Sequence, residues 1–250
     1  MVAGAWLHEE EGEEEMTLNL AHRGFSGRYP ENTMLAFTKA IEAGCDGIAL
    51  EVQLTKDREL VVIHDEKLDR TTDGKGYVCD YTLAELKTLS ASGHFQDIYG
   101  RTEIPTLKEY FELIADTDII TNVELKTGVN IYPGIEQKVL HLIQDYKLSE
   151  RIIISSFNHY SALMFKKLAP QIKCGLLEES WIIGMSGYAK KLGIDYLHPI
   201  YYCVTDSYVQ EAQAHDLGIN TWTVNNREDI QRLKRLNVNA IITNYPDLFE

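Results

Sequence analysis

Hydrophobic and polar positions follow two different periods along this chain. Short runs rich in apolar and β-branched residues are separated by longer stretches in which apolar residues recur every three or four positions. The first pattern is typical of buried β-strands and the second of amphipathic helices. Their regular alternation predicts a parallel sheet whose strands are joined by crossover helices.

The alternation predicts eight strands and seven main helices. The strands are expected at residues 18–22, 47–55, 119–126, 151–157, 173–177, 196–199, 220–224 and 240–243. The helical patterns occupy residues 32–43, 107–115, 134–146, 159–168, 186–192, 206–217 and 227–236. Eight strands with intervening helices fit a closed (β/α)8 TIM barrel, an α/β fold, better than an open sheet.

One irregularity lies between the second strand and the helix expected at residues 107–115. A hairpin is predicted there, in which residues 52–54 turn through residues 56–59 into residues 60–64, and a Gly-containing stretch follows up to Pro105. We therefore expect residues 16–250 to form one barrel domain with a small inserted subdomain at about residues 56–105. Residues 1–15 contain a run of Glu and are predicted to be an acidic leader, either disordered or an artificial addition.

Composition and charge narrow the class of protein. Hydrophobic residues make up 44% of the 250 residues and charged residues 25%, as in folded globular domains. The formal net charge of −14 and the absence of a basic stripe argue against nucleic-acid binding. Four scattered cysteines give neither a disulfide framework nor a zinc motif. Without a long apolar run or a secretory signal, we expect a cytoplasmic protein with no membrane span.

Polar residues gather at the C-terminal ends of the predicted strands, where active sites of such barrels lie. Carboxylates bind hard divalent cations, Arg and Lys offset the charge of phosphate oxygens, and His transfers protons. Each residue alone is as well explained by a structural role, but their shared position predicts chemistry on a phosphate ester. The residues are His22, Arg23, Glu51, His64, Glu124 and Lys126.

The same residues lie within a set of motifs that resembles the glycerophosphodiester phosphodiesterase family. HRG is followed by PENT and then by VVIHDEKLDRTT, and NVELKTG, SSFNH, HPIYY, WTVN and IITNYPD come behind them in this order. The combination of the first three motifs is highly specific. The resemblance covers residues 18–247, which is almost the whole chain after the acidic leader.

The resemblance implies a TIM barrel with an insertion after the second strand, and it implies a reaction. Glycerophosphodiesters such as glycerophosphocholine would be hydrolysed to glycerol 3-phosphate and an alcohol, as part of lipid and glycerol metabolism. His22 and His64 would be the general acid and base, and the nucleophile would be water or the substrate's own glycerol hydroxyl. Arg23 and Lys126 would bind the phosphate.

The metal site implied by the resemblance departs from the family pattern. Glu124 would hold Mg²⁺ or Ca²⁺ together with two acids of the second strand, but the first of these is Ala49 here and the second, an Asp in the family, is Glu51. Three explanations stay open. Glu51 and Glu124 hold the ion with water, or the chain is an inactive relative that binds a phosphate ligand, or it is an engineered barrel with altered activity.

Two aromatic residues near strand ends add a possible substrate contact. Trp222 and Phe157 would line the alcohol side of the pocket, where aromatic faces contact choline-like cations. Packing in the core explains each of them equally well. His198, which precedes a proline, is expected to be a hydrogen-bonded structural histidine. The sequence predicts no oligomeric state and no head-group preference.

Overall fold

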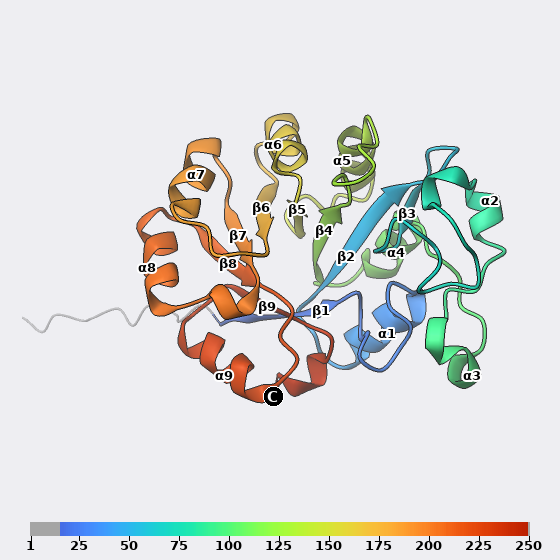
Figure 1. Ribbon diagram of the computed structural model, residues 1–250, viewed down its shortest axis with the longest axis horizontal. Helices are drawn as coiled ribbons and strands as arrows, with labels where there is room; N and C mark the ends of the chain where they lie inside the picture. Colours follow the sequence, from blue (N-terminus) through green and yellow to red (C-terminus); the bar gives the residue numbers. More distant parts are fainter. Residues whose placement is uncertain (1–15, 250) are drawn as a thin grey trace, which may run out of the picture.

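A computed structural model of the chain describes residues 16–249, and its eight parallel strands form a closed barrel (Figure 1). The first strand pairs with both the second and the last, which closes the sheet and confirms the predicted TIM barrel. The barrel strands are Leu18–His22 (β1), Gly47–Leu54 (β2), Ile120–Leu125 (β4), Ile152–Ser156 (β5), Lys173–Glu178 (β6), Tyr196–Pro199 (β7), Gly218–Thr221 (β8) and Ala240–Thr243 (β9).

Seven helices surround the barrel in the part of the chain described. They are Met34–Glu42 (α1), Leu107–Ile114 (α4), Ile135–Asp145 (α5), His159–Leu168 (α6), Met185–Leu192 (α7), Asp206–Ala214 (α8) and Arg227–Arg235 (α9). The predicted helix at residues 32–43 starts at Met34 because the Thr33 hydroxyl accepts a hydrogen bond from the Ala36 amide and caps it. Up to residue 249, only the 3₁₀ turn Pro246–Leu248 (η4) follows β9.

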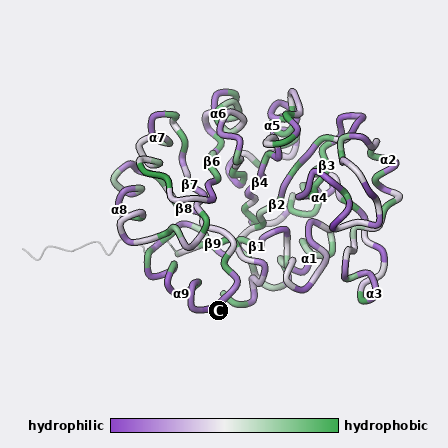
Figure 2. Tube along the Cα trace, viewed as in Figure 1, coloured by the Kyte–Doolittle hydropathy of each residue, from purple (hydrophilic) through white to green (hydrophobic). Residues whose placement is uncertain are grey.

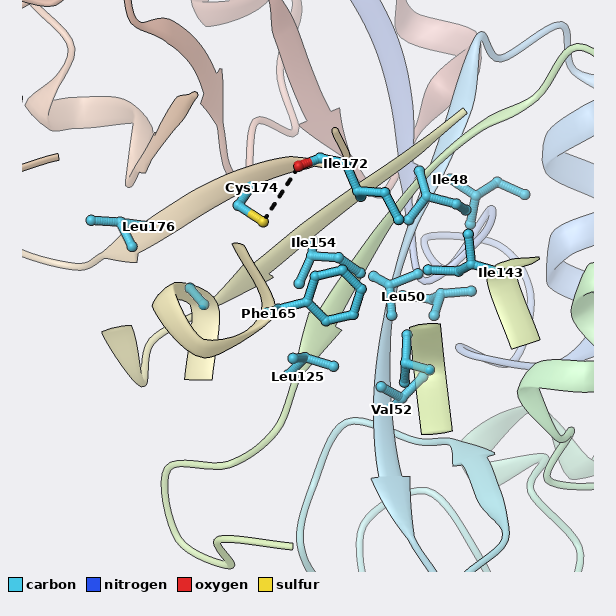
Figure 3. Close-up of a cluster of buried hydrophobic side chains, with 14 of the residues drawn as sticks. Ile48, Leu50, Val52, Leu125, Ile143, Ile154, Phe165, Ile172, Cys174 and Leu176 are labelled. Atoms are coloured by element: carbon cyan, nitrogen blue, oxygen red, sulfur yellow. Dashed lines mark hydrogen bonds between the residues drawn. The ribbon is translucent and has the colours of Figure 1, made fainter. Parts of the chain in front are cut away.

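The main core lies between the outer face of the strands and the helices. In β2, Ile48, Leu50 and Val52 point outward toward this core, and Phe165 of α6 packs in the same cluster (Figure 3). Figure 2 shows hydrophobic positions along the strands and alternating polar and apolar positions along the helices. Because strand side chains alternate, Ala49 and Glu51 are directed to the barrel interior.

The segment between β2 and α4 forms a small unit beside the barrel. Strand β3, Leu60–Val62, pairs antiparallel with the end of β2, so that the predicted hairpin is present. The 3₁₀ turns Val78–Asp80 (η1) and Gly93–Phe95 (η2) and the short helices Leu83–Leu86 (α2) and Gln96–Tyr99 (α3) follow. This unit has its own apolar cluster, which includes Val61, Leu68 and Leu86.

The predicted strand at residues 220–224 is wrong at both ends. Strand β8 begins at Gly218, which pairs with Tyr196, and it ends at Thr221. The chain then leaves the ladder at Trp222, which forms a single bridge to Ile200 beyond the end of β7. The predicted acidic leader lies outside the described residues. Among residues 16–249, no helix has the length and hydrophobicity needed to cross a membrane.

Candidate active site

A cavity of about 80 Å³ opens at the C-terminal ends of the strands. Six of the seven residues proposed from the sequence line it, and they come from loops and strands spread over the chain. Lys126 lies beside it, with its Nζ 3.4 Å from Glu124 Oε1 and 3.5 Å from His64 Nε2. The six lining residues are His22, Arg23, Glu51, His64, Glu124 and Trp222.

His22 ends β1 and is oriented by a residue that follows β9. Its Nδ1 lies 2.7 Å from Asn244 Oδ1, and because an amide oxygen only accepts, Nδ1 carries the hydrogen. The Ser26 hydroxyl lies 3.0 Å from the same oxygen. His22 Nε2 lies 3.6 Å from Glu51 Oε1, so in the doubly protonated ring its N–H faces this carboxylate. Barrel closure therefore fixes the ring with Nε2 toward the carboxylate.

His64 is placed in a similar way from the other side of the cavity. Its Nδ1 donates to Asp65 Oδ1 over 2.6 Å, so Nε2 is the nitrogen free to accept a proton. Burial lowers the pKa of His64, and the positive charges of Arg23 and Lys126 lower it further against the opposing effect of Glu51. His64 is therefore neutral at pH 7 and suited to act as a base.

Gln53 of β2 holds the backbone on both sides of His64. Its amide nitrogen lies within hydrogen-bond distance of the carbonyl oxygens of Ile63, His64 and Asp65, at 3.0, 3.2 and 2.7 Å. Its amide oxygen accepts a hydrogen bond from the hydroxyl of Tyr132 at 2.9 Å. Gln53 is fully buried, so these bonds replace water contacts that it cannot make. No role for Gln53 was predicted from the sequence.

Arg70, from the insertion, joins the histidine to the first loop of the barrel. Its guanidinium donates to both carboxylate oxygens of Asp65, at 2.7 and 2.9 Å, and to both of Glu31, at 2.7 and 2.8 Å. Glu31 in turn accepts a bond from Arg23 Nη1 at 2.7 Å. The hydrogen bonds from Arg70 hold the pKa of Asp65 well below its usual range. Only a planar fork can serve two carboxylates in this way.

Glu51 is almost completely buried and has several partners. Its Oε1 accepts from Arg23 Nε at 3.1 Å, and its Oε2 accepts from Asn32 Nδ2 at 2.6 Å. Burial acts to raise the pKa of Glu51, but the charge of Arg23 and the hydrogen bond of His22 hold it well below its usual range.

The HRG turn requires its glycine. Gly24 has φ 78°, and a Cβ there would lie 2.6 Å from the backbone of Ala36.

The pKa of Glu124, in β4, is shifted in the opposite direction to that of Glu51. Burial raises its pKa to about 7, the charge of Lys126 opposes this shift, and the charge of Glu51 adds to it. Ala49 also lines the cavity and contributes only a methyl group, packed in a cluster with Leu20 and Ile242. Within the described residues, no three His, Cys, Asp or Glu side chains are grouped closely enough to hold a metal alone.

The other side of the cavity is apolar. This side is lined by Phe157, Leu177, Ile242 and Trp222. The rings of Phe157 and Trp222 meet edge to face, with their centroids 5.5 Å apart. The indole nitrogen of Trp222 donates to the carbonyl oxygen of His198 at 2.8 Å, which fixes the ring. His198 itself is buried and lies 3.1 Å from the Asn220 amide nitrogen, as expected of a structural histidine.

Comparison with known proteins places these features in one family. Residues 22–248 match the model of the glycerophosphoryl diester phosphodiesterase family. A glycerophosphodiester phosphodiesterase of Caldanaerobacter subterraneus is 46% identical, over 92% of this chain and 95% of that protein. The chain belongs to the glycerophosphodiester phosphodiesterase family. One of Bacillus altitudinis is 43% identical, over 93% of this chain and 96% of that protein.

Solved structures of this glycerophosphodiester phosphodiesterase family share the fold. An Oleispira antarctica phosphodiesterase, in complex with the product sn-glycerol-3-phosphate, has a TM-score of 0.81 and 30% identity, over 94% of this chain and 95% of that one. The Thermotoga maritima glycerophosphodiester phosphodiesterase has a TM-score of 0.74 and 31% identity, over 93% and 96%. Membership makes this chain a phosphodiester hydrolase of the glycerophosphodiester phosphodiesterase type.

Four residues that shape the family site were missed by the sequence analysis as site residues. Asn32, Arg70 and Asn244 lie inside the PENT, LDRTT and IITNYPD motifs, so the signal was present. Gln53 shares the face of β2 with Glu51. The position of each of these four residues in the sequence does not by itself indicate which groups it contacts.

Proposed function

We propose that the cavity hydrolyses glycerophosphodiesters to glycerol 3-phosphate and an alcohol, with His64 as general base and His22 as general acid. The observation that carries this proposal is the paired orientation of the two rings. Each is hydrogen-bonded through Nδ1, to Asp65 or to Asn244, and each keeps Nε2 for proton transfer. General acid and base groups need this fixed geometry.

In the proposed reaction, neutral His64 accepts the proton of the attacking hydroxyl, which is water or the glycerol hydroxyl of the substrate. The new P–O bond forms as the bond to the alcohol breaks, and His22, doubly protonated at the start of this step, gives its Nε2 proton to the departing oxygen. Attack by water yields glycerol 3-phosphate directly, whereas attack by the glycerol hydroxyl yields a cyclic phosphate that water then opens to glycerol 3-phosphate. Lys126 and Arg23 stabilise the negative charge of the phosphate oxygens. Arg23 lines the cavity and Lys126 lies beside it, with its Nζ 3.4 Å from Glu124 Oε1, so we assign a phosphate contact to both.

We further propose that Glu51 and Glu124 hold a divalent cation, with Mg²⁺ favoured over Ca²⁺. Mg²⁺ commonly binds one or two carboxylates together with water and substrate phosphate, which suits a cavity with two carboxylates. The raised pKa of Glu124, about 7, fits the proposal, because a cation near both groups would favour its ionised form. When bound, the cation supplies positive charge beside the phosphate.

The proposal is tested by measuring glycerol 3-phosphate released from glycerophosphocholine and glycerophosphoethanolamine, with Mg²⁺, with Ca²⁺ and with EDTA. We expect turnover with Mg²⁺, loss of turnover with EDTA, and a loss of at least about 100-fold in His64→Ala with Mg²⁺ present. The proposed reaction is wrong if no glycerophosphodiester is hydrolysed with either ion.

Ala49 supports a second candidate function, a barrel that binds a phosphate ligand without efficient turnover. A family carboxylate is missing at this position, and its methyl group faces the cavity. We expect Ala49→Glu combined with Glu51→Asp to raise turnover at limiting Mg²⁺ by about 10- to 100-fold, the usual scale of losses around metal sites. Ala49→Gln with Glu51→Asp is the uncharged control. Equal glycerol 3-phosphate binding with and without EDTA, and no turnover in any variant, would favour the second function.

A further inference from the structure

Asn122 of β4 has an unpartnered oxygen atom in the wall of the active-site cavity. The residue lines the cavity and is only 3% exposed. Its amide nitrogen donates to the Ser155 hydroxyl at 3.0 Å, but its Oδ1 is buried and accepts no hydrogen bond from any of residues 16–249. No other described residue that lines the cavity has a buried side-chain nitrogen or oxygen without a partner. Because an unpaired buried oxygen costs free energy, this atom indicates a ligand.

The strand register places Asn122 beside the missing carboxylate. Strands β2 and β4 are neighbours in the sheet (Figure 1), and Ala49 is opposite Asn122, while Glu51 is opposite Glu124. All four residues line the cavity. Asn122 is therefore the neighbour, on the adjacent strand, of the position at which the family pattern has its first acid.

The hydrogen bond to Ser155 also orients the amide of Asn122. Strand β4 lies between β2 and β5 in the sheet, and Ser155 belongs to β5. The nitrogen and the oxygen lie on opposite sides of the planar amide group. Because the nitrogen is directed to β5, Oδ1 faces away from β5, on the side of Ala49.

The cationic side chains of the cavity are directed to carboxylates and not to Asn122. Arg23 Nε donates to Glu51 Oε1 at 3.1 Å, and Lys126 Nζ lies 3.4 Å from Glu124 Oε1. The wall around Asn122 Oδ1 thus offers a neutral amide oxygen and two carboxylates, which are oxygen donors only when the carboxylates are ionised. Such a donor set suits a hard divalent cation.

We propose that Asn122 Oδ1 is the third protein ligand of the divalent cation, in place of the carboxylate that Ala49 lacks. The inference rests on the proposed cation site at Glu51 and Glu124 and adds a ligand to it. Three protein oxygens are kept, but the site has one negative charge less than the family pattern. Affinity for the ion should therefore be weak, and a carboxylate at position 122 should raise it.

The test is isothermal titration calorimetry of the full chain with MgCl₂ and with CaCl₂, in the absence of substrate. Asn122→Ala should bind the ions at least about tenfold more weakly, since it removes a ligand. Asn122→Asp should bind them at least about tenfold more tightly, since it restores the third carboxylate.

The matched controls are Asn19→Ala and Asn19→Asp. Asn19 of β1 is 4% exposed, and its Oδ1 also lacks a partner among the described residues, but it does not line the cavity. Both controls should bind the ions as the unchanged chain does. Thermal unfolding verifies the folding of each variant, and Asn122→Ala decides the matter if the buried charge of Asn122→Asp prevents folding.

Equal affinity of Asn122→Ala and the unchanged chain would overturn the inference and leave the cation site at Glu51 and Glu124 intact. If the affinity is equal but KM for glycerophosphocholine rises in Asn122→Ala, the oxygen accepts from a substrate hydroxyl instead. If the unchanged chain binds neither ion, the inference fails together with the cation site. The proposed hydrolysis is judged separately, by release of glycerol 3-phosphate.

Discussion

The two halves of the barrel mouth are built on different physical principles. On the side of β1, β2, β4 and the insertion, His22, Glu51, His64 and Glu124 are held by hydrogen bonds and ion pairs. On the side of β5 to β8, the cavity wall is formed by packed apolar groups such as Phe157 and Trp222. We infer from this contrast that the charged half performs the chemistry and that the apolar half binds the alcohol part of the substrate.

The difference also sets the cost of changing each half. Removing the partner of a buried charge lowers the free energy of unfolding by about 3–5 kcal/mol, because water does not replace the lost contact. Trimming one aromatic ring at a partly exposed wall loses mainly contact area, at about 25 cal/mol per Å². Substitutions in the charged half should therefore have large effects on kcat, and those in the apolar half smaller effects on KM.

The largest effect is expected from His64→Ala. Removal of the proposed base should lower kcat by about 10²–10⁴-fold, the usual contribution of general base catalysis. Phe157→Leu, across the cavity, should leave kcat nearly unchanged. Steady-state kinetics with glycerophosphocholine compare the two variants. Equal losses of kcat would show that the halves do not differ in function.

A smaller loss is expected from Arg70→Ala. The change removes the group that holds Asp65 and Glu31 together, so His64 loses its orientation but not its imidazole. We expect kcat to fall by about 10- to 100-fold with little change in KM, as for other residues that orient an active group. The kcat of Arg70→Lys should lie between that of the unchanged chain and that of Arg70→Ala, because an ammonium group cannot bind both carboxylates as the guanidinium does.

The control for Arg70 lies in the same insertion. Arg101 forms an exposed ion pair with Glu103, and Arg101→Ala removes a positive charge of the same kind. Its kcat should match that of the unchanged chain. An equal fall in both variants would mean that the insertion, and not the Arg70 contacts, limits activity.

Trp222→Leu should have a weaker effect, restricted to substrates with a cationic alcohol. Loss of a cation–π contact of ~0.5–1 kcal/mol corresponds to a rise in KM of about two- to fivefold for glycerophosphocholine. A substrate with an uncharged alcohol, such as glycerophosphoglycerol, should show almost no rise. Equal rises for both substrates would assign Trp222 to packing and remove it from recognition.

The burial of His198 predicts that the free energy of unfolding depends on pH. Burial lowers its pKa to about 3, so the folded protein keeps the ring neutral while the unfolded chain takes up a proton below about pH 6.5. Its contribution to stability is present above pH 6.5 and is lost as the pH falls toward 3. Between pH 7 and pH 5, the free energy of unfolding should fall by about 2 kcal/mol from this group.

Urea unfolding of the unchanged chain and of His198→Gln at pH 7 and pH 5 measures this contribution. The variant should lose about 2 kcal/mol less between the two pH values. Identical losses would show that acid destabilises the protein through groups other than His198.

Much of the fold and of the candidate site could be predicted because their signals are local. Alternation within single strands places Glu51 and Glu124 on the inner face, and the strand ends identify His22. The contact of His22 with Asn244 joins residues 222 positions apart and exists only after the barrel closes. Arg70 reaches Glu31 from the insertion for the same reason. No local sequence pattern predicts such long-range contacts.

The position of His64 also has a consequence for heating. This residue is carried by the segment after β3, which packs on a small cluster separate from the main core, whereas His22 belongs to the barrel wall. A unit with few buried contacts opens at lower free energy than the whole domain. Moderate heat should therefore abolish turnover before the barrel melts, and cooling should restore it. The enzyme would thus have an inactivation temperature below its unfolding temperature.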